Sequence, residues 1–99
     1  MKAPSRAARE AAETLAIQAL AFVAEEPARL ARFLAASGIE AEQIRAAARE
    51  RGFLAGVIEH MLADESLLVA FADSADIDPA AIARAHAALG GGQWERDVP

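Results

Sequence analysis

Several reactive residue types are scarce in this chain of 99 residues, which contains no cysteine, no tyrosine, one tryptophan and two histidines. Without cysteine there can be no disulfide, no thiolate nucleophile and no thiolate-ligated metal. Few side chains remain that could exchange protons near neutral pH. We therefore expect a protein without catalytic residues or cofactors, and not an enzyme.

Long apolar segments are also absent. The best apolar run, residues 15–24, is interrupted by Gln18 and has about half the length of a membrane-spanning helix. The N-terminal residues lack the apolar stretch of a secretory signal peptide. These absences predict a cytoplasmic protein that does not bind membranes.

The composition indicates the fold class. Hydrophobic residues make up 55% of the chain and charged residues 25%, which is typical of a globular protein. Many of the hydrophobic residues are alanines, which favour helix. No segment alternates apolar and polar residues with the period of a strand. The sequence thus predicts an all-α single domain over residues 4–89, followed by a flexible C-terminal tail over residues 90–99.

An internal repeat predicts how the helices are organised. Residues 15–48 resemble residues 54–86, so that Leu15 corresponds to Leu54 and Phe33 to Phe71. A repeat of this length is typical of small helical units that bury their apolar faces against each other. Each unit contains the signals for three helices. We therefore predict a compact six-helix domain built from two three-helix pseudo-repeats.

Local signals mark where helices begin and end in both units. Gly38 suits the left-handed residue after a helix, with Ile39 reaching back to Leu34 in a Schellman motif. Asp76 takes the corresponding place in the second unit. Helix caps are expected at Ser5 or Pro4, at Asp64 or Glu65, and at Asp78. Glu40 and Gln43 are expected to form a capping box.

The charge distribution bears on the choice of partner. The net charge of −5 argues against nucleic-acid binding, which requires a cationic surface. Residues 53–83 contain six acidic residues and no lysine or arginine. Asp64, Glu65 and Asp73 could form an acidic face for a basic partner, or chains could associate head to tail. An ordinary solvated surface would explain the same residues.

The first predicted helix, over about residues 4–25, is apolar on two faces. Ile17 and Leu20 form a stripe separate from the other apolar residues of this helix. Such a helix is either central in its domain or covered by a partner, so an interface with another protein or a homodimer stays open. The face expected to be buried in the core carries Ala8, Ala11, Ala12, Leu15, Ala19 and Phe22.

The tail offers a second candidate for contact with a partner. Trp94, the only tryptophan, follows three consecutive glycines. An aromatic side chain on a flexible segment can anchor in a groove of another protein. The alternative is that Trp94 folds back onto its own domain or frays.

Candidates for metal or acid–base chemistry are weak. His60 has Glu59 beside it and Asp64 one turn later, but a metal site needs three or four ligands. A solvated helix face with Asp64 as a cap accounts for all three residues. His86 falls on the apolar stripe of the last helix and is expected to be half-buried and structural. We predict no metal site.

Several segments carry a resemblance to a known family: residues 21–27, 32–34, 37–39, 62–68 and 70–72. Over about residues 10–90 the chain resembles the family of small, mainly proteobacterial proteins catalogued as domain of unknown function 3572. The resemblance implies a stand-alone bacterial cytoplasmic protein that is all-helical. It implies no activity and no functional residue.

The function that we predict is a non-catalytic protein-interaction or regulatory adaptor with an unidentified protein partner. The alternative is a small-ligand or metal-binding protein that uses a cavity or helix face between the repeats with His60, Asp64 or His86. The residues expected to contact a protein partner are Ile17, Leu20, Asp64, Glu65, Asp73 and Trp94.

Overall fold

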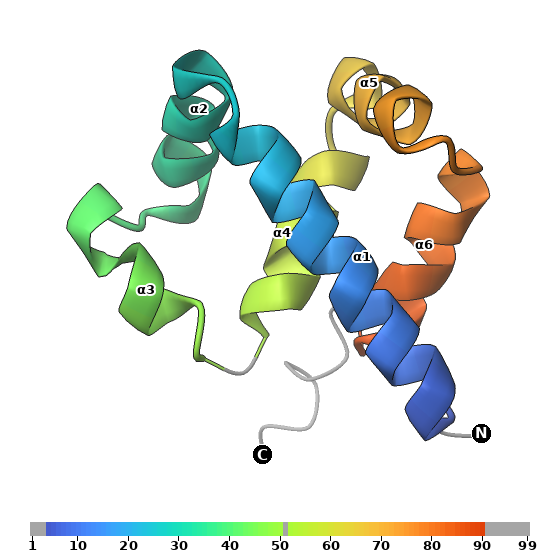
Figure 1. The fold of residues 1–99 in the computed structure, drawn as a ribbon. Coiled ribbons are helices and arrows are strands. Elements are labelled where there is room, and N and C mark those ends of the chain that lie inside the picture. Colours follow the sequence, from blue (N-terminus) through green and yellow to red (C-terminus); the bar gives the residue numbers. More distant parts are fainter. Residues whose placement is uncertain (1–3, 51, 91–99) are drawn as a thin grey trace.

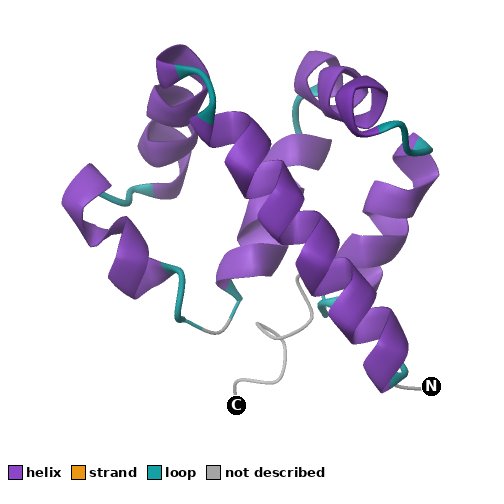
Figure 2. Cartoon of the chain, viewed as in Figure 1, coloured by secondary structure: helices purple, strands orange, loops and turns teal. Residues whose placement is uncertain are grey.

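The computed structural model describes residues 4–50 and 52–90, and the regular secondary structure of this part of the chain is all helical, with no strand (Figure 2). The all-α prediction is therefore confirmed. The elements are the α-helices α1 (Arg6–Ala24), α2 (Pro27–Ser37), α3 (Ile44–Ala47), α4 (Phe53–Leu62), α5 (Glu65–Ala75) and α6 (Pro79–Ala88), and the 3-10 helix η1 (Ala41–Gln43).

Two crossing helices organise the domain. α1 crosses α4, with α2 and α3 on one side of this pair and α5 and α6 on the other (Figure 1). α1 packs against α4, α6 and α2, and α4 also packs against α5 and α6. Of the two alternatives for the first helix, a central position is the one that the packing of α1 shows.

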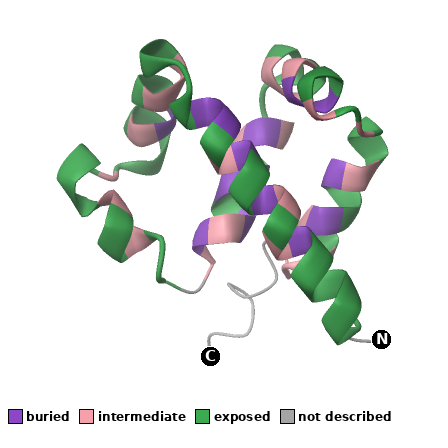
Figure 3. Cartoon of the chain, in the orientation of Figure 1, coloured by how far each residue is buried: buried purple, intermediate pink, exposed green. Residues whose placement is uncertain are grey.

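The core lies where α1, α4 and α6 meet, and Figure 3 shows the buried residues concentrated there. Ala16 and Ala19 on α1 are fully buried, because a methyl side chain lets the backbones of neighbouring helices approach closely. Burial of a large aliphatic side chain contributes about 1.5–3 kcal/mol to folding. The large side chains buried most completely are Ile58, Met61, Ile82, Val23 and Val57.

The buried face of α1 differs in part from the predicted one. Ala8 and Ala11 were expected in the core but are exposed, because the first turns of α1 extend beyond the other helices (Figure 1). Leu15 is only partly buried. The face that the structure buries consists of Ala12, Ala16, Ala19, Phe22 and Val23.

The predicted helix starts are confirmed at the atomic level. The Ser5 hydroxyl accepts a hydrogen bond from the Ala8 amide at 3.0 Å. The Asp64 carboxylate accepts from the amide of Leu67 at 3.2 Å. Asp78 accepts from the Ala80 amide in the same manner, and Glu40 and Gln43 form the predicted capping box. These side chains satisfy amides that have no partner within the helix.

The Schellman motif expected at the end of α2 is not formed. Gly38 is left-handed with a φ of 77°, as predicted, and its amide donates to the Leu34 carbonyl at 2.9 Å. The Ile39 amide, however, donates to the Ser37 hydroxyl, so the helix ends in the simpler left-handed motif.

The end of α5 has the Schellman motif instead. Asp76 is left-handed with a φ of 58°. The Ile77 amide donates to the Ala72 carbonyl at 2.9 Å, and the Asp76 amide donates to Asp73. The predicted correspondence between Gly38 and Asp76 therefore holds for backbone conformation but not for hydrogen bonding.

The two halves of the domain differ in their third helix. α6 has ten residues and packs against α1 and α4, whereas α3 has four residues and no extensive packing against another α-helix of the described chain. α3 touches the core through the partly buried Ile44 and Ala47. A space is left between α3 and α4. The predicted internal repeat stays a prediction from the sequence.

Candidate functional site

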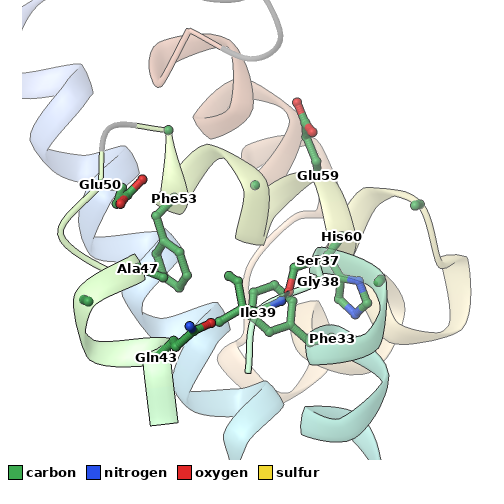
Figure 4. Close-up of a pocket in the computed structure, with 15 residues that line it drawn as sticks. Phe33, Ser37, Gly38, Ile39, Gln43, Ala47, Glu50, Phe53, Glu59 and His60 are labelled. Atoms are coloured by element: carbon green, nitrogen blue, oxygen red, sulfur yellow. Dashed lines mark hydrogen bonds between the residues drawn. The ribbon is translucent and has the colours of Figure 1, made fainter. Parts of the chain in front are cut away.

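A cleft of about 810 Å³, open to solvent, lies between the end of α2, the η1–α3 segment and α4 (Figure 4). We call it the α2–α4 cleft. It exists because α3 stays apart from α4, in contrast to the close packing of α6 on the other side. The side chains that line its apolar floor are Phe33, Ile39, Ala47 and Phe53.

Two aromatic rings fix the floor of the α2–α4 cleft. The rings of Phe33 and Phe53 meet edge to face, with centroids 6.2 Å apart and planes at 86°. His60 meets Phe33 edge-on at 5.2 Å. Phe33 and Phe53 are 3% and 8% exposed, so the core holds them in place. The floor is therefore preformed and apolar.

Gly56 opens the cleft on the α4 side. It lies in the middle of α4, lines the cleft, and is exposed. A Cβ atom at this position would meet no other atom within 4 Å, so packing within the chain does not require glycine. Glycine in a helix costs about 1 kcal/mol relative to alanine. The chain thus keeps a residue that weakens α4 and leaves the backbone of the cleft wall accessible.

The polar side chains of the cleft bond to neighbours in the structure. The Ser37 hydroxyl donates to the Leu34 carbonyl, and the Gln43 side chain accepts from the Glu40 amide. The Glu59 carboxylate lies 3.0 Å from His86 Nε2 on α6. These groups stabilise helix ends and helix packing and do not converge on a common point.

The cluster that the sequence suggested around His60 does not form. His60 packs against Phe33, Glu59 pairs with His86, and Asp64 caps α5. The interpretation of Asp64 as a cap is confirmed. His86 is half-buried, as predicted, although its pairing with Glu59 was not foreseen. Nowhere in residues 4–50 and 52–90 do three or more His, Cys, Asp or Glu side chains come together to hold a metal ion.

A smaller pocket of about 300 Å³ adjoins His60 on the other side and includes Asp64 and Arg29. Arg29 is engaged in the packing of α2 on α1. Its guanidinium lies 4.0 Å from the centroid of the Phe22 ring, donates to the Phe22 carbonyl, and pairs with Glu26 at 3.6 Å. This pocket is therefore part of a helix junction.

The predicted apolar stripe of α1 is divided by the structure. Ile17 is 57% exposed, but Leu20 is partly buried and packs against the core. The central position of α1 thus accounts for Leu20 and not for Ile17. Another exposed large apolar side chain, Val69, lies on α5.

The remaining predicted contact residues do not gather at the α2–α4 cleft. Asp64, Glu65 and Asp73 are exposed. Asp64 and Glu65 lie at the start of α5, and Asp73 lies further along it. None of the three lines the described cleft. Trp94 lies outside the described residues.

The sequence reasoning missed the α2–α4 cleft, although one signal for it was present. Gly56 interrupts a run of helix-forming residues, and an isolated glycine inside a helix often has a packing or functional reason. The second determinant, the short α3, depends on tertiary packing and has no comparable local signal.

Comparisons with known proteins give a family and no further relative. Neither the curated proteins nor the solved structures include a match to the chain. In the described part of the chain, no helix is both long and apolar enough to cross a membrane. A family model described as "Protein of unknown function (DUF3572)" matches residues 9–92. Since this match covers most of the sequence, the chain belongs to the DUF3572 family of proteins of unknown function.

Proposed function

We propose that the protein is a non-catalytic interaction module, a regulatory adaptor that binds a segment of another protein in the α2–α4 cleft. The observation that supports this most strongly is the cleft itself, an open space of about 810 Å³ above an apolar floor. The floor leaves surface of the partly buried Ile39 and Ala47 in water, and covering apolar surface of this kind favours association. A cytoplasmic setting, predicted from the sequence, is part of the proposal.

The shape and chemistry of the cleft favour a protein over a small molecule. Sites for small ligands enclose most of the ligand and present polar groups that converge on it. The α2–α4 cleft is open, and its Ser37, Gln43 and Glu59 side chains bond to neighbours in the chain. Binding here would have to depend on apolar contact area, which a protein segment provides. The same features argue against an enzyme.

Ile17 supports the interaction function at a second place. Its 57% exposure leaves an aliphatic side chain in water on the outer face of α1. A single exposed aliphatic residue is common on protein surfaces, so it carries less weight than the cleft. A homodimer through Ile17 is an alternative outcome of the experiment below.

The test uses Gly56, where a side chain can be added without disturbing the fold. The tagged full chain and its Gly56→Trp variant are used to capture partners, with Gly56→Ala as a control that adds only a methyl group. Ala83→Trp is the matched control, because Ala83 is exposed on α6 and does not line the cleft. Circular dichroism verifies that each variant is folded.

We expect that the wild type, Gly56→Ala and Ala83→Trp all capture the same partner and that Gly56→Trp does not. A partner that Gly56→Trp retains would contradict the proposal. Loss of binding, or of self-association, in an Ile17→Glu variant alone would place the interface on α1 instead. Light scattering on the same samples distinguishes binding of a partner from dimerisation.

A further inference from the structure

The α2–α4 cleft contains charges as well as an apolar floor. Its acidic lining residues in the described chain are Glu50 and Glu59, which Figure 4 shows on separate sides of the cleft. The Glu59 carboxylate also lies 3.0 Å from His86 Nε2 on α6. Arg45 lies on α3 and Arg49 follows this helix. Both are exposed, and neither lines the cleft. Arg51 lies outside the described residues.

The form of the occupant follows from the helical surface. An extended peptide gains most of its affinity from pairing with an open sheet edge, and residues 4–50 and 52–90 contain no strand. A helix instead inserts apolar side chains into a groove between helices. The exposed backbone at Gly56, with no atom within 4 Å of a Cβ placed there, lets a second helix approach α4 closely.

We infer that the occupant of the α2–α4 cleft is an amphipathic α-helix of a partner protein, laid across Gly56 with its basic residues facing Glu50 and Glu59. This inference rests on the proposed function. The apolar face of the partner helix contacts the partly buried Ile39 and Ala47, beside the buried rings of Phe33 and Phe53. The carboxylates set which partners bind and in which orientation, since complementary charge gives specificity and speeds association.

The tail of the chain itself is a poorer match for the same cleft. Residues 91–99 contain Glu95 and Asp97 against the single cation Arg96. An acidic segment placed beside Glu50 and Glu59 would be repelled. The charges therefore favour a basic partner over the tail as the occupant.

The test is a titration of the full chain, labelled with 15N, with synthetic amphipathic helical peptides. The first peptide has leucines and one tryptophan along one face and lysines on both flanks. The second has a glutamate in place of each lysine, and the third keeps the lysines but has a central proline that breaks the helix. The amide signals of Gly52 and Gly56 report on occupancy of the cleft, and the signal of Ile17 reports on the α1 surface.

We expect the lysine peptide to shift the signals of Gly52 and Gly56 and to bind about tenfold more tightly than either of the other two. A Glu50→Lys/Glu59→Lys double variant should reverse the preference between the lysine and glutamate peptides. Both carboxylates are on exposed residues, and Glu59→Lys removes the pair with His86 but no buried side chain, so this variant should fold, which circular dichroism verifies. Equal binding of all three peptides, tighter binding of the glutamate peptide, or shifts centred on Ile17 would overturn the inference.

The peptide titration and the capture experiment distinguish failure of this inference from failure of the proposed function. If no peptide binds but Gly56→Trp still abolishes capture of a partner, the cleft is the docking site and the inference about a basic helix is wrong. If deleting residues 91–99 shifts the Gly56 signal without any peptide, the tail occupies the cleft and the inference is also wrong. If the peptides behave as expected, both proposals are supported together.

Discussion

The ring of Phe33 on α2 meets the ring of Phe53 on α4 edge to face, with 6.2 Å between the centroids, and this contact forms the floor of the α2–α4 cleft. Aromatic pairs in this geometry contribute about 0.5–1.5 kcal/mol beyond their burial. A double-mutant cycle of Phe33→Leu and Phe53→Leu, measured by urea unfolding, should give a coupling energy in that range. Additive effects of the two changes would show that the rings do not support each other.

Gly56→Ala should stabilise the protein. Alanine is favoured over glycine inside a helix by about 1 kcal/mol, and the new methyl group meets no neighbour. Thermal unfolding followed by circular dichroism should show Tm rising by several degrees. Gly38→Ala is the control, because space is equally free there but a φ of 77° disfavours alanine. It should lower Tm; a fall in Tm for Gly56→Ala would mean that α4 packs differently.

The free energy of unfolding of variants at Asp76 should depend on how well the new residue tolerates the left-handed conformation. Asp76 has a φ of 58°, which glycine adopts freely and alanine does not. We expect Asp76→Gly to match or exceed the wild type in free energy of unfolding, and Asp76→Ala to lose about 1 kcal/mol. Urea unfolding gives both values. If Asp76→Ala were as stable as Asp76→Gly, backbone strain at this turn would be excluded.

Two isoleucines should respond very differently to truncation. Ile82 on α6 is fully buried, whereas Ile17 on α1 is 57% exposed. Ile82→Ala removes buried methyl groups and leaves a cavity, so the free energy of unfolding should fall by about 2–5 kcal/mol. Ile17→Ala should change it by less than about 0.5 kcal/mol. A large loss for Ile17→Ala would show that another chain buries it.

The helices and their boundaries could be predicted because their signals are local. Ser5, Asp64 and Asp78 cap helices through bonds to amides two or three residues away. Gly38 and Asp76 adopt the predicted left-handed conformation. Contacts of this kind depend on a few neighbouring residues and therefore appear directly in the sequence.

The pairing of helices was harder to predict because it depends on which faces meet. Periodicity placed Leu15 and Ala19 in the core, but the close approach of α4 and α6 fully buries Ala16 together with Ala19 and leaves Leu15 only partly buried. The pair of Glu59 and His86 joins residues that are 27 positions apart. The α2–α4 cleft likewise results from what α3 does not cover, and no local pattern records that.

The most direct test of the account is a photo-crosslinking experiment in cells that express the full chain. A photoreactive phenylalanine analogue replaces Ala36, an exposed residue of α2 that lines the cleft, in one sample and, as controls, Ile17 or Ala83 in two others. Mass spectrometry then identifies any crosslinked protein and the segment of it that reacts. The account predicts a specific adduct from position 36 on a basic amphipathic helix of a partner, absent from position 83. Adducts from position 17 alone would contradict the central claim that the α2–α4 cleft binds the partner.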